Sequence, residues 1–419
     1  MSPAAVSLAL VVASLGQYSN RYNSYGSYGT IKKDELEYQQ QNFKQWWGQD
    51  LVIKLEELPL EGRVPDFRVP YSGHDYPDQN GGTINALVKY DRAFHGGRML
   101  ATEFERQDIG GHRGGGERRG LFGRIRRGGT PGWYGHCNGW TAASIRHAEP
   151  QHNVVRNGVT FTPADIKGLL AEMYMYTESE FLGGVDPAIN AGTLHLTLTN
   201  WLGRGSHPVG METAIGEVVI NYPIFSYKAK VNKLSDRQSE VQMSIRYAVN
   251  TPRETDKGPK DFNRLMYFHY SLDTNEAGEI QAGRYYGDSN QIDMLWSPLQ
   301  PAQGGEEKNK RGNPHMSIKE VLAIWRESVP EDLRKKWLNI DPTEEDRVLP
   351  PEDVAATTTA EPPAPATTAA PAEGTAPATA APAGSPAPAG STPPSTSPAT
   401  PTSPATPAAP APAETPANP

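Results

Sequence analysis

The sequence contains a single cysteine, Cys137, among 419 residues. One cysteine excludes an internal disulfide and cannot build a cysteine-rich zinc site. The histidines do not fall at the spacings of metal ligands, and there is no His-Glu-x-x-His run. The sequence therefore predicts neither a metal nor a cofactor, and a lone cysteine by itself is usually a small buried hydrophobe.

Long apolar runs are also missing. The most apolar stretch, residues 4–16, has the length of a signal-peptide core and is too short to span a bilayer. It lacks the positively charged start of a typical signal peptide, so a misplaced start is the alternative. We interpret residues 1–16 as a possible signal peptide and expect a secreted or cell-surface protein without stable membrane insertion.

Acidic residues outnumber basic ones, which gives a formal net charge of -8. The local exception is Arg113 to Arg127, where six arginines alternate with glycines. Glycine-rich spacing gives no fixed face for reading a nucleic-acid groove, so we predict a solvated loop and no nucleic-acid partner.

The C-terminal residues 349–419 have no basic and no aromatic side chain. They consist mostly of Ala, Pro, Thr and Ser, so they cannot bury enough apolar surface to offset the entropy of ordering. We predict a disordered tail here, a polar N-terminal segment or pro-region at residues 17–63, and one catalytic domain at residues 64–348.

The residues around Cys137 favour a catalytic role of this cysteine over a role in core packing. Glycine and aromatic residues precede it, and Trp140 to Ile145 reads as the first turns of a helix with an apolar face. A thiol at a helix N-terminus is favoured as thiolate by about 0.3 to 1 kcal/mol. We predict that Cys137 is a nucleophile, which also needs a base, usually a histidine. Ten histidines are present, so the existence of a partner proves nothing.

The periodicity along the chain predicts helices first and antiparallel strands later, an α+β fold. Thr162 is the N-cap candidate of a helix running to about Met175. Residues 193–202 fit either a strand or a helix. The other predicted helices are 34–47, 86–94, 98–107 and 317–328, and the predicted strands are 217–223, 225–234, 242–249, 264–272 and 279–286, the last two joined as a hairpin.

Several segments resemble successive blocks of the oomycete transglutaminase elicitor family, and together they cover residues 64 to 330. No single block is specific, but their order is. The blocks are Cys137 to Ala143, Phe161 to Lys167, Asn190 to Leu196, Glu217 to Pro223, Pro70 to Gly73, Gly283 to Gly287 and Asp293 to Trp296.

The resemblance implies a papain-like cysteine-enzyme fold and a calcium-independent protein-glutamine gamma-glutamyltransferase. In that family the cysteine at the position of Cys137 attacks a glutamine carboxamide, and a lysine or other amine takes the acyl group from the thioester. The expected partners are protein substrates bearing glutamine and lysine. The backbone N–H of Cys137 is a natural oxyanion donor.

The base is open. His195 lies in a matching block and is the first choice, although a satisfied core histidine is equally compatible. Family members often have a histidine where this chain has Gln291, so the base is either another residue, such as His269, or the activity is impaired. Asn221 and Asp293 are candidates to orient the imidazole, as the third member of a thiol triad does.

Two other functions stay open. A papain-like cysteine protease or deamidase would resolve the same thioester with water. A catalytically impaired structural surface protein would explain Gln291 and the long tail. Elicitor activity is not carried over, because the segment Val219 to Val231 departs from the residues typical of the family.

Overall fold

The computed structural model describes residues 28–73, 82–112, 134–184, 188–216, 218–259 and 262–336. The possible signal peptide, the arginine-glycine loop and the C-terminal tail lie outside these residues, so they remain predictions. Among the described residues, no helix combines the length and the apolar character needed to cross a membrane.

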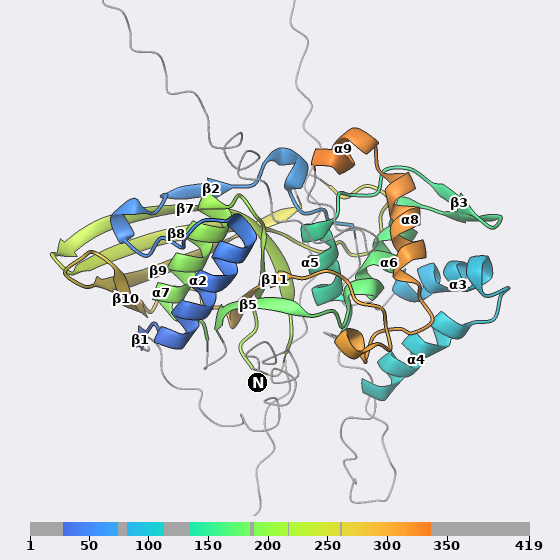
Figure 1. Ribbon diagram of the computed structural model, residues 1–419, viewed down its shortest axis with the longest axis horizontal. Coiled ribbons are helices and arrows are strands. Elements are labelled where there is room, and N and C mark those ends of the chain that lie inside the picture. The colour runs from blue at the N-terminus through green and yellow to red at the C-terminus, as the bar shows by residue number, and fades with distance from the viewer. Residues whose placement is uncertain are drawn as a thin grey trace, which may run out of the picture. The chain divides into compact units, whose positions relative to one another are not determined.

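Within the described part of the chain, nine strands form one antiparallel sheet (Figure 1). Its order is β1-β10-β9-β8-β7-β6-β11-β5, with β2 also pairing with β7. The strands are β1 (Tyr28–Thr30), β2 (Glu61–Arg63), β5 (Ser179–Gly184), β6 (Val209–Glu212), β7 (Asn221–Ser235), β8 (Gln238–Ala248), β9 (Asn263–Thr274), β10 (Ile280–Tyr285) and β11 (Met294–Pro298); β3 (Val154–Arg156) and β4 (Val159–Phe161) form a separate hairpin.

The helices fall into two groups, one on the sheet and one beside it (Figure 1). They are α2 (Lys33–Trp47), α3 (Gly82–Phe94), α4 (Leu100–His112), α5 (Cys137–Arg146), α6 (Pro163–Tyr174), α7 (Ala191–Thr197), which continues as a π-helical stretch (Leu198–Arg204), α8 (Ile318–Ser328) and α9 (Glu331–Lys336); short 3-10 turns occur at Leu55–Glu57, Asp66–Arg68 and Glu307–Asn309.

The first hydrophobic core lies between the sheet and the helices α2 and α7. Phe43 and Trp47 of α2 pack edge-on against Trp201 of the π-helical stretch. Residues 28–63, predicted as a polar segment or pro-region, thus supply β1, α2 and β2 to the fold. The largely polar sequence of α2 gave little indication of the few large side chains that it buries.

The second core is helical and contains residues of α3, α5, α6 and α8. Helix α6 begins as predicted: Thr162 accepts from the N–H of Asp165, and the Asp165 carboxylate accepts from the N–H of Thr162. This reciprocal capping box, with Pro163 in the first turn, fixes the start of the helix against which α5 packs.

Helix α5 lies where the two cores meet, in contact with α6 and with β6, β7 and β11. Gly139, in the first turn of α5, allows the close approach, because a Cβ there would lie 2.0 Å from the carbonyl oxygen of Ala171 in α6. The Trp140 indole is fully buried and donates to the Tyr71 carbonyl. The first residue of α5 is thereby fixed beside the start of β7.

The mixed helix and antiparallel sheet architecture agrees with the α+β prediction, including the hairpin of β9 and β10. The sequence predicted two strands, 217–223 and 225–234, with a break after Pro223. That break is wrong, because β7 runs through Pro223. Pro223 pairs with Gly210 of β6, whereas β8 begins to pair only at Ile224. The missing N–H of the proline therefore costs no bond on that side. Strands β6 and β11 were not predicted, since both are buried throughout and show no alternation.

Candidate functional site

Cys137 is the first residue of α5, and its side chain faces the beginning of β7. The residue is 2% exposed. Its Sγ accepts from the backbone N–H of Asn221 at 3.4 Å and lies 3.6 Å from Asn221 Nδ2. It also lies 3.7 Å from the carbonyl oxygen of Val219. The structure thus brings two of the four predicted site residues, Cys137 and Asn221, into contact.

The orientation of the Asn221 amide is fixed by Trp296 of β11. The indole Nε1–H donates to Asn221 Oδ1 at 2.9 Å. An indole is a donor only, so the atom that it meets must be the amide oxygen, and the NH₂ group must point toward Sγ. Gly210, opposite Trp296 in the sheet, leaves room for the ring, because a Cβ there would lie 2.6 Å from it.

Two carboxyl groups lie near Asn221, one in β6 and one just before β11. Glu212 of β6 is directly opposite Asn221 of β7, so both side chains project from the same face of the sheet. The N–H of Asp293 donates to the carbonyl of Glu212. Burial and the negative charge of Asp293 raise the pKa of Glu212 to about 8, and burial raises the pKa of Asp293 to about 6. Such paired, perturbed carboxyls are common at functional sites.

His195 lies in α7, inside the first core. Its Nδ1 is 2.8 Å from the Tyr270 hydroxyl of β9, and burial lowers the pKa of the imidazole to about 3. Helix α7 contacts β1, β5, β9 and β10, and Figure 1 shows it well apart from α5. The structure does not bring His195 to Cys137.

His269, the alternative base, lies on β9, which β8 separates from β7. Its Nδ1 is 2.9 Å from Asp288 and its Nε2 is 3.0 Å from Glu240. Burial opposes the charge of the imidazole, but the hydrogen bonds to Glu240 and Asp288 outweigh it and raise the pKa of His269. Gln291 is half-buried in the connection between β10 and β11.

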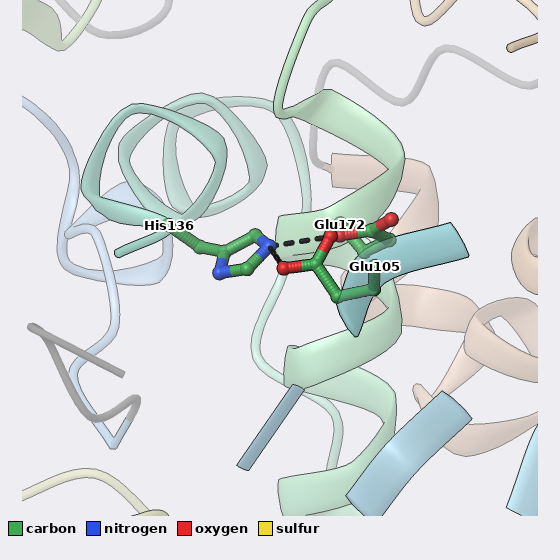
Figure 2. A group of neighbouring side chains, drawn as sticks. All are labelled: Glu105, His136 and Glu172. Atoms are coloured by element: carbon green, nitrogen blue, oxygen red, sulfur yellow. Dashed lines mark hydrogen bonds and ion pairs between the residues drawn. The ribbon is translucent and has the colours of Figure 1, made fainter. Parts of the chain in front are cut away.

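A second polar cluster includes His136, the residue before Cys137. Its other members are Glu105 of α4 and Glu172 of α6 (Figure 2). His136 Nε2 is 2.8 Å from Glu172 Oε2 and 3.3 Å from Glu105 Oε1. Burial and the charge of Glu172 raise the pKa of Glu105 to about 8. Burial opposes protonation of His136, but the carboxylates outweigh it and hold the pKa of His136 well above its usual value.

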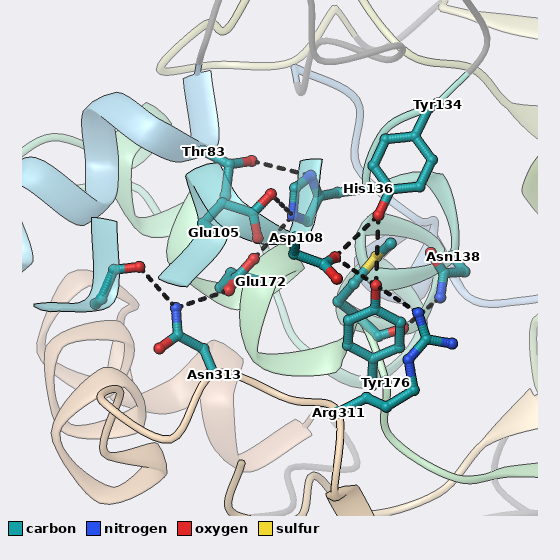
Figure 3. Close-up of polar contacts among 12 residues, drawn as sticks. Thr83, Glu105, Asp108, Tyr134, His136, Asn138, Glu172, Tyr176, Arg311 and Asn313 are labelled. Atoms are coloured by element: carbon teal, nitrogen blue, oxygen red, sulfur yellow. Dashed lines mark hydrogen bonds and ion pairs between the residues drawn. The ribbon is translucent and has the colours of Figure 1, made fainter. Parts of the chain in front are cut away.

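Further polar groups surround this cluster (Figure 3). Thr83 Oγ1 lies 3.5 Å from His136 Nδ1, and Asn313 Nδ2 donates to Glu172 Oε1 at 3.0 Å. On the neighbouring side, the Asp108 carboxylate accepts from the hydroxyls of Tyr134 and Tyr176. The cluster therefore connects α4, α6 and the residue before Cys137.

Sequence reasoning missed Trp296, Glu212 and the Glu105–His136–Glu172 cluster. Trp296 stands in a block that resembles the family, and that block could have indicated it. The other residues come from separate elements and meet only through the tertiary fold, so no local pattern marks them.

Comparison with known proteins finds similarity to one family. Residues 122–184, which include Cys137 and α5, match the family model described as Transglutaminase elicitor. The fold is similar to the crystal structure of the GP42 transglutaminase from Phytophthora sojae, with a TM-score of 0.56 and 21% sequence identity over 72% of this chain and 99% of that one. No curated protein matches the chain. The resemblance to the transglutaminase elicitor family is therefore confirmed.

Proposed function

We propose that the chain is a thiol acyltransferase of the transglutaminase type, in which Cys137 transfers the acyl group of a protein glutamine to a lysine or another primary amine. The observation that carries the proposal is the contact between Cys137 Sγ, at the N-terminus of α5, and Asn221, whose amide Trp296 holds in one orientation. Asn221 thus places an amide donor beside a thiol at a helix N-terminus, where the thiolate form is favoured.

The proposed reaction begins when the Cys137 thiolate attacks the glutamine carboxamide carbon. The carbonyl oxygen becomes an oxyanion, for which the N–H of Cys137 and Nδ2 of Asn221 are the proposed donors. Preorganised donors of this kind contribute about 3 to 4 kcal/mol each. The proton that the Cys137 thiol gave up goes to the leaving nitrogen, so collapse expels ammonia and leaves a thioester. The amine then attacks the thioester, and its proton passes to the departing sulfur, which gives the isopeptide bond and the free thiol. The structure does not bring His195, the base predicted from the sequence, to Cys137, so the proposal assigns it no catalytic step.

Substrate must reach a thiol that is 2% exposed. Because the Val219 carbonyl lies against Sγ, residues 218–220 have to move before a glutamine side chain can approach. The proposed partners are proteins that bear glutamine and lysine, outside the cell or at its surface, where crosslinks of this type persist.

The test is incorporation of a dansylated primary amine into a glutamine-containing protein by the full chain. Replacing Cys137 with Ala should reduce the rate by at least about 10³-fold, as expected for loss of a nucleophile. Ser144→Ala is the matched control, since it removes a hydroxyl bonded only within α5 and should leave the rate unchanged.

Other products distinguish the competing functions. Release of ammonia without amine incorporation identifies a deamidase, and cleavage of the polypeptide identifies a protease. Wild-type chain that is folded and yields none of the three products contradicts the proposal and favours the structural surface protein.

A further inference from the structure

The Glu105–His136–Glu172 cluster is built from three elements and lies in the interior. Glu105 is 2% exposed, His136 1% and Glu172 4%. Taking charged groups out of water costs several kcal/mol for each ion unless a partner of opposite charge compensates it. The cluster therefore needs positive charge to match its two carboxyl groups.

The imidazole cannot meet this need alone. His136 Nε2 carries at most one hydrogen, and that hydrogen faces Glu172 Oε2 at 2.8 Å. Glu105 Oε1, 3.3 Å from the same nitrogen, accepts no hydrogen bond from the residues that the structure describes, although it is buried and directed into the cluster (Figure 2). A buried carboxylate oxygen without a hydrogen bond is costly and calls for a bound cation or a proton.

The spacing of the three groups suits a metal ion. One atom from each residue can be chosen so that all three lie within 4.8 Å of one another. The two distances from Nε2, 2.8 and 3.3 Å, are close to the separation of about 3.3 Å between ligands of a tetrahedral ion bound at about 2.0 to 2.1 Å. A small adjustment of the side chains would admit the ion.

The neighbouring groups hold the three side chains in the required orientation. Thr83 Oγ1 faces His136 Nδ1, which leaves Nε2 turned to the carboxylates. Asn313 bridges Glu172 Oε1 and the carbonyl of Ala101 in α4. Outer contacts to the second ring nitrogen and to the ligating carboxylates are typical of metal sites.

The donor set also restricts the metal. One imidazole nitrogen with two carboxylates is typical of Zn²⁺ and related first-row transition ions, whereas Ca²⁺ and Mg²⁺ select sites made of oxygen alone. We propose that Glu105, His136 and Glu172 form a binding site for one divalent transition-metal ion, with Zn²⁺ as the first candidate. This site is independent of the acyl-transfer proposal and does not touch the reacting atoms.

Such an ion would tie α4 and α6 to the residue before Cys137. It would therefore act as a structural link that holds the start of α5 in place against the sheet. The competing explanation is a proton shared by Glu105 and Glu172, which also removes one negative charge. The two explanations differ in whether the folded chain takes up metal.

The experiment uses the full chain, purified without a histidine tag and dialysed against a chelator. Zn²⁺ is titrated by calorimetry, and Co²⁺ is added separately to record visible absorption bands. We expect one equivalent of Zn²⁺ to bind with micromolar or tighter affinity, a rise in the melting temperature, and Co²⁺ bands of the intensity shown by four- or five-coordinate sites.

The variant is Glu105→Gln, which keeps the shape of the side chain and removes its charge. It should weaken Zn²⁺ binding by at least about 10-fold and abolish the Co²⁺ bands. Glu103→Gln is the control, since Glu103 lies on the same helix in an exposed pair with Arg106. It should bind like the wild type.

Either of two results overturns the site: wild-type chain that takes up neither ion, or Glu105→Gln that binds as tightly as Glu103→Gln. Should Glu105→Gln fail to fold, the wild-type titration and Co²⁺ spectrum decide alone. Wild-type chain without metal uptake, together with a Glu105→Gln variant of unchanged or higher stability, identifies the shared proton instead.

Discussion

The Cys137 end of α5 and the interior beneath α7 are both buried, and both contain segments that resemble the same family. They differ in how their polar groups are satisfied. Cys137 meets Asn221 from β7, which in turn is held by Trp296 from β11. His195 has the Tyr270 hydroxyl as its hydrogen-bond partner, inside one core. A chain of polar contacts that runs through three elements and ends on a nucleophilic thiol, more than burial or membership of a block, marks the candidate site.

The largest effect on activity is expected at Asn221, where α5, β7 and β11 meet. Asn221→Ala removes the proposed oxyanion donor and should lower kcat by about 10² to 10³-fold with little change in fold. Asn232→Ala is the control on the same strand, since that amide bonds only the partly exposed Glu240. Steady-state amine incorporation measures both, and equal rates for the two variants would remove Asn221 from the site.

His195 should behave as a core residue. His195→Ala leaves a cavity and leaves the Tyr270 hydroxyl with Met243 Sδ as its remaining contact, so the free energy of unfolding should fall by about 2 to 4 kcal/mol, while kcat of the folded protein stays close to wild type. Denaturant unfolding and activity are measured on the same samples, with Tyr270→Phe as the partner variant. A stable His195→Ala protein without activity would restore His195 as the base.

Stability at the Cys137 side should depend on pH through Glu212. The pKa of Glu212 is about 8 in the folded state and ordinarily 4.5, so the folded state binds the extra proton between these values. The stabilising contribution is full below pH 4.5 and is lost as pH rises through 8, by on the order of 2 to 4 kcal/mol.

Glu212→Gln mimics the protonated form, so its unfolding free energy should lose that part of the pH dependence. Urea unfolding across the pH window measures the difference. Parallel pH profiles for wild type and Glu212→Gln would show that Glu212 does not titrate there, and would shift attention to Asp293.

The smallest effect concerns orientation of the amide. Trp296→Phe replaces the indole with a smaller aromatic ring and removes the Nε1–H that fixes Asn221. We expect kcat to fall by about 10-fold, the equivalent of one hydrogen bond of about 1.4 kcal/mol, with KM nearly unchanged. A KM effect alone would assign Trp296 to substrate binding.

The sequence predicted those parts of the fold that local patterns control. The apolar periodicity and the Thr162 cap located α6, and the turn after Asp273 located the β9–β10 hairpin. Strands β6 and β11 were missed because strands buried on both faces lose the alternation that marks a strand. Helix α2 was predicted at residues 34–47, but its place in the core was not, because it buries few, large side chains.

The candidate site was predictable only in part. Cys137 and Asn221 could be named from separate segments, but their contact depends on how α5 packs against β7. The Glu105–His136–Glu172 cluster has no local signature, because its members are distant in the sequence. Glu212 was missed for the same reason, since its position opposite Asn221 follows from sheet register.

The most direct test of the account is intact-mass analysis of the chain incubated with a glutamine donor peptide and no amine. The account predicts a covalent adduct equal in mass to the peptide less one ammonia, located on Cys137, absent in Cys137→Ala and discharged by added amine. An adduct on another residue, or a folded chain that forms no adduct while it still incorporates amine, would contradict it.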